Sequence, residues 1–352
     1  MTQSHIILIS LFTLMSCAKT DNNPVEVNTP AIYTNSISTD RMTLVLSAPS
    51  IHDTYYRDRF DAIVNFQVNY VNAIIGNDNV IILADRDTRP YFEGRVPNDI
   101  LLTVEVQDIW MRDFTTVNPM NPVQFVYSWA SMSQSESVRV QRSFARMADL
   151  LGLERKQTHY ILDGGNVVDN YAGKAIVTSR FLEDNDLSME QARTVLKDLL
   201  GAGSVAIILP DDEVLAHADG MVMWADETTL LLNDYSEFPD FRAQVLAELE
   251  SSFPDVRIVE VPVTWDNTSS GGIGSACGIN VNATTTHNTI YVPVFNGSND
   301  AQIIETMRNE SSKKIVSVDA TGVCVLGGSV RCLTWQLAGS NAEKIILAAR
   351  EN

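Results

Sequence analysis

A single cysteine near the end of the chain, Cys332, closes the run Val-Leu-Gly-Gly-Ser-Val-Arg-Cys, just past a Gly-Gly turn. Three other segments carry polar turns of a similar kind. Asp113 ends a Trp-Met-Arg-Asp segment, residues 163–166 read Asp-Gly-Gly-Asn, and His217 and Asp219 stand in a His-Ala-Asp-Gly segment. A thiol nucleophile needs an acid–base partner and groups that hold its substrate, and these segments supply both. They indicate a Cys/His/Asp/Asp site for attack on a guanidinium group.

The composition is that of a globular protein with an acidic surface. Of its 352 residues, 45% are hydrophobic and 20% are charged, which allows a sizeable core in one large domain or two smaller ones. The formal net charge of −19 argues against nucleic acid and anionic membrane surfaces as electrostatic partners. The excess of carboxylates would keep the protein soluble, and it could also concentrate a cationic small substrate.

The first residues predict export. Residues 6–15 form an apolar run that is too short to span a bilayer, and it ends in Leu-Met-Ser-Cys, which resembles a bacterial lipobox with Cys17 as the lipidated residue. The segment before the run has no Lys or Arg, only His5. We expect a signal peptide over 1–16, a flexible tether over 17–38 and one folded domain over 39–352. The protein would then be an exported lipoprotein held at a membrane, in the periplasm or at the cell surface. The alternative is a buried N-terminal strand.

Three cysteines remain once Cys17 is assigned to a lipid anchor: Cys277, Cys324 and Cys332. An odd number in an exported protein leaves at least one thiol free. Cys277 and Cys324 could form a disulfide and leave Cys332 reduced, or both could be small core residues. The sequence leaves these two possibilities open.

From residue 42 the chain repeats one pattern five times: an apolar strand, a helix, a second strand and a polar segment. Capping signals support the helices, because Ser188 with Gln191 fits a capping box and Pro239 fits the first turn of a helix. Five such units cannot bury their apolar faces singly, but around a common axis they can share a core. The predicted helices lie within 55–75, 138–151, 188–200, 239–249 and 300–307, and the polar segments at 110–117, 163–168, 217–224, 279–283 and 327–333.

This arrangement would bring the polar segments together at one end of an α/β propeller. A doubly wound α/β sheet also alternates strands and helices, but no Gly-x-Gly-x-x-Gly turn opens a helix here. We therefore expect a five-fold pseudosymmetric α/β propeller. The Gly-rich run 269–274 could form a mobile lid or a solvent-exposed loop.

The polar segments in combination resemble the guanidine-modifying (pentein) superfamily of α/β propellers. Within it, the chain is most similar to the group of agmatine deiminases and Porphyromonas-type peptidylarginine deiminases. The resemblance covers roughly residues 40–340 and rests on W-x-R-D at 110–113, G-G-N at 164–166, H-x-D-G at 217–220 and Gly-Gly with a following cysteine and T-x-Q tail at 327–336. It implies the propeller fold and a deiminase activity that needs no cofactor and no metal.

The resemblance also implies a role for each site residue. Cys332 matches the nucleophile and His217 the general acid and base. Asp113 and Asp219 match the two carboxylates that hold the guanidinium, which is a planar cation able to form paired hydrogen bonds with each. Asn282 matches a polar site residue of the peptidylarginine branch. The thiolate would form a thiouronium intermediate, which water would hydrolyse to a ureido product.

Other residues near these motifs have structural and functional interpretations. Trp110 could stack on the cationic substrate or pack in the core. We expect Arg112 to support its turn, with an ion pair to Asp113 as the structural alternative, and we expect Asp163 and Asn166 to shape theirs. We interpret His159 and His287 as incidental, and no Cys/His spacing resembles a zinc site.

Several functions remain open from the sequence. The first is hydrolysis of peptidyl or free arginine to citrulline and ammonia, which the export signal favours. The second is agmatine deimination to N-carbamoylputrescine in putrescine biosynthesis. Against the second, the chain reads Arg-Asp-Phe-Thr-Thr where the agmatine branch has R-D-x-G-P, Ser-Val-Arg before the cysteine where it has N-x-H, and Thr-Trp-Gln where it has T-Q-Q. The remaining two are an amidinotransferase and a non-catalytic surface lipoprotein that kept the fold.

Overall fold

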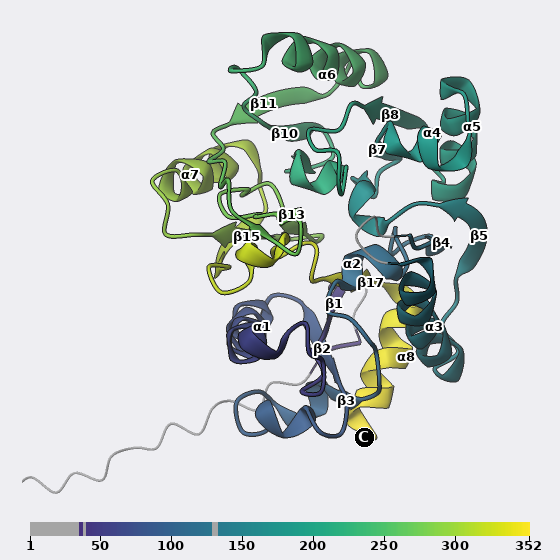
Figure 1. The fold of residues 1–352 in the computed structure, drawn as a ribbon, viewed down its shortest axis with the longest axis vertical. Coiled ribbons are helices and arrows are strands. Elements are labelled where there is room, and N and C mark those ends of the chain that lie inside the picture. Colours follow the sequence, from purple (N-terminus) through teal and green to yellow (C-terminus); the bar gives the residue numbers. More distant parts are fainter. Residues whose placement is uncertain (1–34, 38–39, 129–132) are drawn as a thin grey trace, which may run out of the picture. The chain divides into compact units, whose positions relative to one another are not determined.

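The computed structural model describes residues 35–37, 40–128 and 133–352 (Figure 1). The predicted signal peptide, Cys17 and nearly all of the predicted tether lie outside these residues. Within them, five pairs of parallel strands are each joined by a helical crossover, as the repeat predicted. The pairs are β1 (Thr43–Ser47) with β2 (Asn79–Ala84), β4 (Val123–Val126) with β5 (Lys156–Ile161), β7 (Lys174–Thr178) with β8 (Ser204–Ile208), β10 (Thr229–Asn233) with β11 (Arg257–Val261), and β15 (Thr289–Val294) with β16 (Lys314–Asp319).

Two of the crossover helices, α5 and α6, begin where the sequence signals predicted. The Ser188 side chain accepts from the Gln191 backbone while the Gln191 side chain accepts from the Ser188 backbone, and Pro239 occupies the first turn of its helix. The sequence analysis missed α4 and the C-terminal α8. The crossovers are α1 (Phe60–Ile74), α3 (Gln134–Leu150), α4 (Arg180–Asn185) with α5 (Met189–Leu200), α6 (Pro239–Ser252) and α7 (Asp300–Glu310), and α8 (Gly339–Arg350) ends the chain.

A short antiparallel strand completes most of the sheets, and it comes from a neighbouring unit. β6 (Val168–Asp169) pairs with β7, β9 (Val222–Trp224) with β10, and β14 (Thr284–Thr285) with β15. Each follows a polar turn, so that turn connects two units, whereas the sequence pattern had assigned it to the end of one.

The last of these strands closes the ring of units. β17 (Trp335–Leu337) directly follows the Cys332 segment and pairs antiparallel with β1. The first sheet therefore has the order β17-β1-β2-β3, with β3 (Leu101–Thr103) as an edge strand that the sequence analysis missed. The C-terminal end of the chain thus anchors the candidate nucleophile on the first unit. This pairing supports the predicted five-fold propeller.

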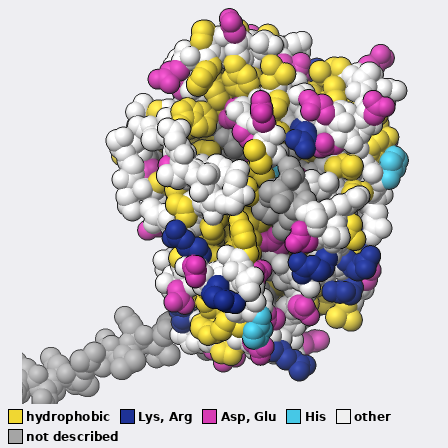
Figure 2. All heavy atoms as spheres, in the orientation of Figure 1, with side chains coloured by type: hydrophobic (Ala, Val, Ile, Leu, Met, Phe, Trp, Pro, Cys, Tyr) yellow, Lys and Arg dark blue, Asp and Glu magenta, His cyan; other side chains and the backbone are white. Residues whose placement is uncertain are grey.

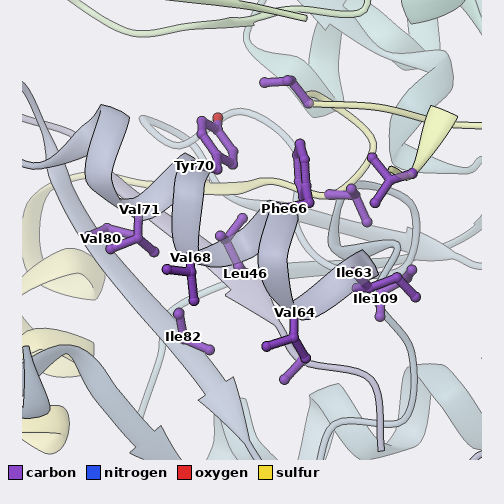
Figure 3. Packing of buried hydrophobic residues seen from close by; sticks show 14 of the residues in the cluster. Leu46, Ile63, Val64, Phe66, Val68, Tyr70, Val71, Val80, Ile82 and Ile109 are labelled. Atoms are coloured by element: carbon purple, nitrogen blue, oxygen red, sulfur yellow. The ribbon is translucent and has the colours of Figure 1, made fainter. Parts of the chain in front are cut away.

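The first unit shows how the helices cover the sheets. Val68 and Val71 of α1 point toward Ile82 and Val80 of β2 (Figure 3), and all four side chains are buried. Burying an aliphatic side chain of this size contributes roughly 1.5–3 kcal/mol relative to leaving it exposed. β1 and β2 are buried along their whole length, as expected for strands covered on both faces. Because β17 pairs with β1, these buried strands support the segment that carries Cys332.

Two details differ from the sequence prediction. The segment at 110–117 was predicted as a polar segment after the second strand, but Met111–Phe114 forms one helical turn, α2. The tether was expected to extend to residue 38, but Asn35 is buried and its side chain both donates to Val80 O (2.9 Å) and accepts from Val80 N (3.1 Å). The end of the predicted tether therefore belongs to the folded domain. None of the helices in the described ranges is long and apolar enough to cross a membrane.

Cys277 and Cys324 form a disulfide, which resolves the alternative that the sequence left open. Cys277 follows the hairpin of β12 (Ser269–Ser270) and β13 (Ile273–Gly274), and Cys324 begins the 3₁₀ turn Cys324–Leu326. Among the described cysteines, Cys332 is the free thiol.

Candidate active site

Cys332 follows a turn of two glycines at which the neighbouring groups leave no room for a side chain. Gly327 enters this turn with a φ of 97°, a conformation that favours glycine. A β-carbon on Gly328 would collide with the Trp110 ring and would lie 2.9 Å from Cys332 Cβ and 3.1 Å from Cys332 Sγ. The Gly-Gly pair therefore lets the backbone fold back onto the nucleophile. Trp110 is buried and packs against this turn, so its observed contact is with the site's backbone.

Asn282 holds the thiol and the turn before it. Its Nδ2 lies 3.2 Å from Cys332 Sγ and also donates to Asp219 O at 3.2 Å. Its Oδ1 accepts from the Ser329 hydroxyl at 2.9 Å and from the Ser329 backbone N–H at 3.3 Å. One amide side chain thus connects the Cys332 turn with the Asp219 turn, although the residues lie far apart in the sequence.

His217 lies between two carboxylates. Its Nε2 is 3.4 Å from Asp163 Oδ2, and its Nδ1 is 3.8 Å from Asp113 Oδ1. Asp113 is held in place by the backbone N–H of Gly165, which donates to Oδ1 at 3.0 Å. A β-carbon at Gly165 would lie 2.5 Å from His217 Nδ1, so only glycine allows the imidazole to approach this turn.

Asp163 was predicted to shape its turn, and the structure gives it a further contact. Its Oδ1 accepts from the Ser128 backbone N–H (3.1 Å), while Oδ2 faces His217. No pattern in the sequence distinguished this contact, because Asp163 Oδ2 meets His217 only where two turns pack together. Asn166 keeps the predicted structural role, because its Oδ1 accepts from the backbone N–H groups of Thr178 (2.8 Å) and Ala218 (3.3 Å).

Asp219 contacts both the thiol and a buried arginine. The residue is 1% exposed, and its Oδ2 lies 3.8 Å from Cys332 Sγ and 3.6 Å from Arg331 Nε. Arg331 is itself buried and donates to Val167 O at 2.8 Å. Arg112 was expected to support its own turn, and the contact that its side chain makes is with β17, where it donates to Gln336 Oε1 at 2.6 Å.

The buried charges shift the protonation of the site. Burial lowers the pKa of His217, but the three surrounding carboxylates raise it more, to about 10. Burial raises the pKa of Asp113 to about 7, against the opposing effect of His217. Burial, together with Asp219 and Asp113, raises the pKa of the Cys332 thiol well above its ordinary value. At neutral pH the free site therefore holds an imidazolium and a protonated thiol.

Two adjoining cavities connect these groups. The larger, about 460 Å³, is lined by His217, Asp219, Asn282 and Cys332. The smaller, about 20 Å³, is lined by Trp110 and Asp113, and it shares His217 and Cys332 with the larger one. The larger volume lies in the range of small-molecule sites. The structure thus brings together the four residues that the sequence singled out as catalytic, from two separate turns and the C-terminal segment.

The two histidines that the sequence marked as incidental lie outside these cavities. His159 is exposed on β5 and His287 lies next to β14; neither lines the two cavities. Over the described residues, no group of three or more His, Cys, Asp and Glu side chains could hold a metal ion.

The site combines a buried thiol with two carboxylates and an imidazolium where turns of the propeller meet. The family that the sequence matches agrees with this chemistry. The model of the Porphyromonas-type peptidyl-arginine deiminase family matches residues 38–338. The chain belongs to this family. Its members and their structural neighbours are guanidine-modifying deiminases of the pentein superfamily. No curated protein matches the chain in sequence.

Solved structures of this deiminase group share the fold. Agmatine deiminase of C. jejuni is 18% identical, with a TM-score of 0.71 over 87% of this chain and 96% of that one. A Porphyromonas gingivalis protein described as an arginine deiminase is 17% identical, with a TM-score of 0.65 over 88% and 98%. A DDAH from Pseudomonas aeruginosa is 10% identical, with a TM-score of 0.51 over 87% and 100%. At these identities the likeness establishes the pentein fold of this chain.

Proposed function

We propose that this deiminase hydrolyses a guanidinium group to a ureido group and ammonia, through a covalent intermediate on Cys332. The observation that carries the proposal is the position of Cys332 Sγ, 3.8 Å from Asp219 and within a cavity that His217 and Asp113 also line. A cysteine-to-serine variant of C. jejuni agmatine deiminase, solved with substrate bound, is in line with a cysteine nucleophile in this fold.

In the first step, the substrate cation enters between Asp113 and Asp219 and neutralises the carboxylates that raise the pKa of Cys332. Binding thereby lowers the pKa of the thiol, which releases its proton to solvent water and attacks the central carbon as the thiolate. A carbon–sulfur bond forms, and one C=N electron pair moves onto nitrogen. The imidazolium of His217 then protonates the leaving nitrogen, the carbon–nitrogen bond breaks, and ammonia departs.

In the second step, the neutral His217 takes a proton from water, and the hydroxide oxygen attacks the thiouronium carbon. The carbon–sulfur bond breaks and returns the thiolate, the hydroxyl proton of the adduct passes to that thiolate, and a neutral ureido product is left with the thiol restored. Asp163 and Asp113 contact the two ring nitrogens of His217, so they hold its orientation through both proton transfers. The overall reaction consumes one water molecule and requires no cofactor.

The larger cavity would also hold the end of the substrate that lies away from the guanidinium group. Its described lining residues include Asp211, Asp266 and Trp265, and none of them is Lys or Arg. Asp211 is held by the Tyr235 hydroxyl, which donates to Oδ2 at 2.6 Å. Such a lining repels a free carboxylate and accepts a neutral or cationic group. The substrate proposed here is therefore arginine within a peptide, or agmatine, in preference to free arginine.

A substrate panel tests this assignment. We expect ureido product from N-acetyl-arginine amide and from agmatine, and a kcat/KM for free arginine that is lower by at least about tenfold, since its carboxylate faces Asp211 without a cationic partner. The two good substrates differ only at their far ends, so their ratio distinguishes the peptidyl from the agmatine function. Free arginine as the best substrate would contradict the interpretation of the lining.

Two other functions of this fold make different predictions in the same assay. An amidinotransferase would release an amine and pass the amidino group to a second amine, so product would depend on an added acceptor. A non-catalytic binding lipoprotein would bind guanidines and give no ureido product. The paired contacts of His217 and the close approach of Asn282 to the thiol favour hydrolysis over loss of activity.

We also propose export and lipid anchoring through Cys17, on the basis of the apolar run and the Leu-Met-Ser-Cys segment. An extracytoplasmic location would place the site near peptides. Wild type is expected in the membrane fraction of its own cells, and Cys17→Ser is expected to leave that fraction, because the substitution removes the acylated thiol. Recovery of both forms in the cytosolic fraction would contradict export and favour the agmatine function.

A further inference from the structure

One wall of the larger cavity is formed by a segment that has few other attachments. Residues 265–267 and 273–276 line the cavity beside Cys332. Ile273 packs so closely on the nucleophile's turn that a β-carbon at Gly327 would lie 2.5 Å from Ile273 Cγ2. Ile273 also lines the smaller cavity, next to Trp110 and Asp113. This wall segment, 265–278, therefore shapes the space around the thiol, although it carries none of the catalytic residues.

The disulfide is the covalent attachment of this wall. Cys277 bonds to Cys324, and the backbone N–H of Ala276 donates to Cys324 O at 2.9 Å. Cys324 begins the 3₁₀ turn that leads directly into Gly327. The wall and the nucleophile's turn are thus joined at one point, which lies three residues before Gly327.

The rest of the wall is held weakly. Its hairpin consists of two-residue strands, and Gly271, Gly272 and Gly278 all have positive φ values. Beyond the disulfide and Ala276, its contacts with the rest of the described chain include the Trp265 ring against the Tyr235 ring, with centroids 5.9 Å apart, and a hydrogen bond from Thr264 N to Gly278 O. A short, glycine-rich hairpin does not hold its position by itself.

We propose that the Cys277–Cys324 disulfide is a redox-sensitive clasp on the active site, an inference that rests on the proposed function. When the disulfide is formed, it holds Ile273 against the nucleophile's turn and closes the cavity. When it is reduced, the wall moves away, substrate binding weakens and Cys332 becomes more accessible. Cys324 is 1% exposed but Cys277 is partly exposed, so a thiol reductant can reach the bond from the Cys277 side.

The opening step balances with one dithiol molecule. Its thiolate attacks Cys277 Sγ and the S–S bond breaks, and the Cys324 thiolate leaves and takes up a proton. The second thiol of the reagent then displaces Cys277, which also becomes a thiol. The protein gains two electrons and two protons, and the dithiol becomes a cyclic disulfide.

The test compares oxidised wild type, dithiothreitol-reduced wild type and the double variant Cys277→Ser/Cys324→Ser, all at a temperature where circular dichroism shows each to be folded. Reduction is expected to lower kcat/KM by roughly tenfold or more, mainly through KM, because displacement of a cavity wall loosens substrate positioning. Iodoacetamide should alkylate Cys332 faster in the reduced enzyme. The double variant should match the reduced enzyme in both measurements and should not respond to dithiothreitol.

Unchanged kcat/KM and unchanged alkylation in the folded, reduced enzyme would overturn the clasp and leave the disulfide with a purely stabilising role. A loss of activity that only follows the unfolded fraction would overturn it as well. If the double variant does not fold, reduction and reoxidation of wild type provide the same comparison. Alkylation needs no turnover, so its rate tests the clasp even where no guanidine is hydrolysed, a result that would contradict the proposed function instead.

Discussion

Replacing Cys332 with alanine is expected to abolish turnover and to leave the fold intact. The side chain supplies the only proposed nucleophile, and loss of such a group lowers kcat by roughly 10⁵-fold or more. The thiol is small and sits beside a cavity, so its loss should change the free energy of unfolding by no more than about 1 kcal/mol. The measurements are kcat with the best substrate and a thermal unfolding curve.

A matched control is Cys332→Ser, which keeps a hydroxyl in the same position and should be nearly as inactive, because a serine hydroxyl without a nearby base is a poor nucleophile. A cationic haloacetamidine should label Cys332 much faster than neutral iodoacetamide does, since the cation pairs with Asp113 and Asp219 and lowers the pKa of the thiol. Appreciable turnover by Cys332→Ala would exclude the covalent mechanism.

Replacing Asp219 with asparagine is expected to change two measurements in opposite directions. The carboxylate is buried beside the thiol, and loss of a charge-assisted contact of this kind costs roughly 2–5 kcal/mol of transition-state binding, or about 30- to 4,000-fold in kcat/KM. The same carboxylate raises the pKa of Cys332. Removing it should therefore lower that pKa, increase the thiolate fraction at pH 8 and speed alkylation by iodoacetamide.

The control for this prediction is Asp198→Asn, which removes the same charge from the exposed face of α5, where Asp198 pairs with Lys156 at 3.3 Å. Asp and Glu side chains are spread over the visible face of the protein (Figure 2), so a general effect of net charge would appear in both variants. We expect Asp198→Asn to behave as wild type. Unchanged kcat/KM in Asp219→Asn would show that this carboxylate does not anchor the guanidinium.

The sequence predicted the elements of the fold because their signals are local. Ser188 with Gln191 and the helical proline Pro239 mark helix starts, and apolar runs mark the buried strands. It could not predict how the units join, because pairing of β17 with β1 depends on closure of the whole ring. That closure is a contact between residues almost 300 positions apart, and no local pattern encodes it.

The candidate site was predictable to a similar extent. Cys332, His217, Asp113 and Asp219 could be singled out because each stands in a distinctive turn. The role of Asp163 could not be assigned, because its second oxygen meets His217 only after two turns pack together. The disulfide likewise stayed open in the sequence, since Cys277 and Cys324 lie 47 residues apart and only the packed wall brings them together.

The central claim is that Cys332 carries the substrate's amidino carbon during turnover. The most direct measurement is to quench the enzyme with acid during steady-state hydrolysis of its best substrate and to map the modified peptide by mass spectrometry. The account predicts a substituted amidino adduct on the peptide that contains Cys332, present during turnover and lost when the substrate is exhausted. Steady ureido production with an unmodified Cys332, or an adduct on a different residue, would contradict it.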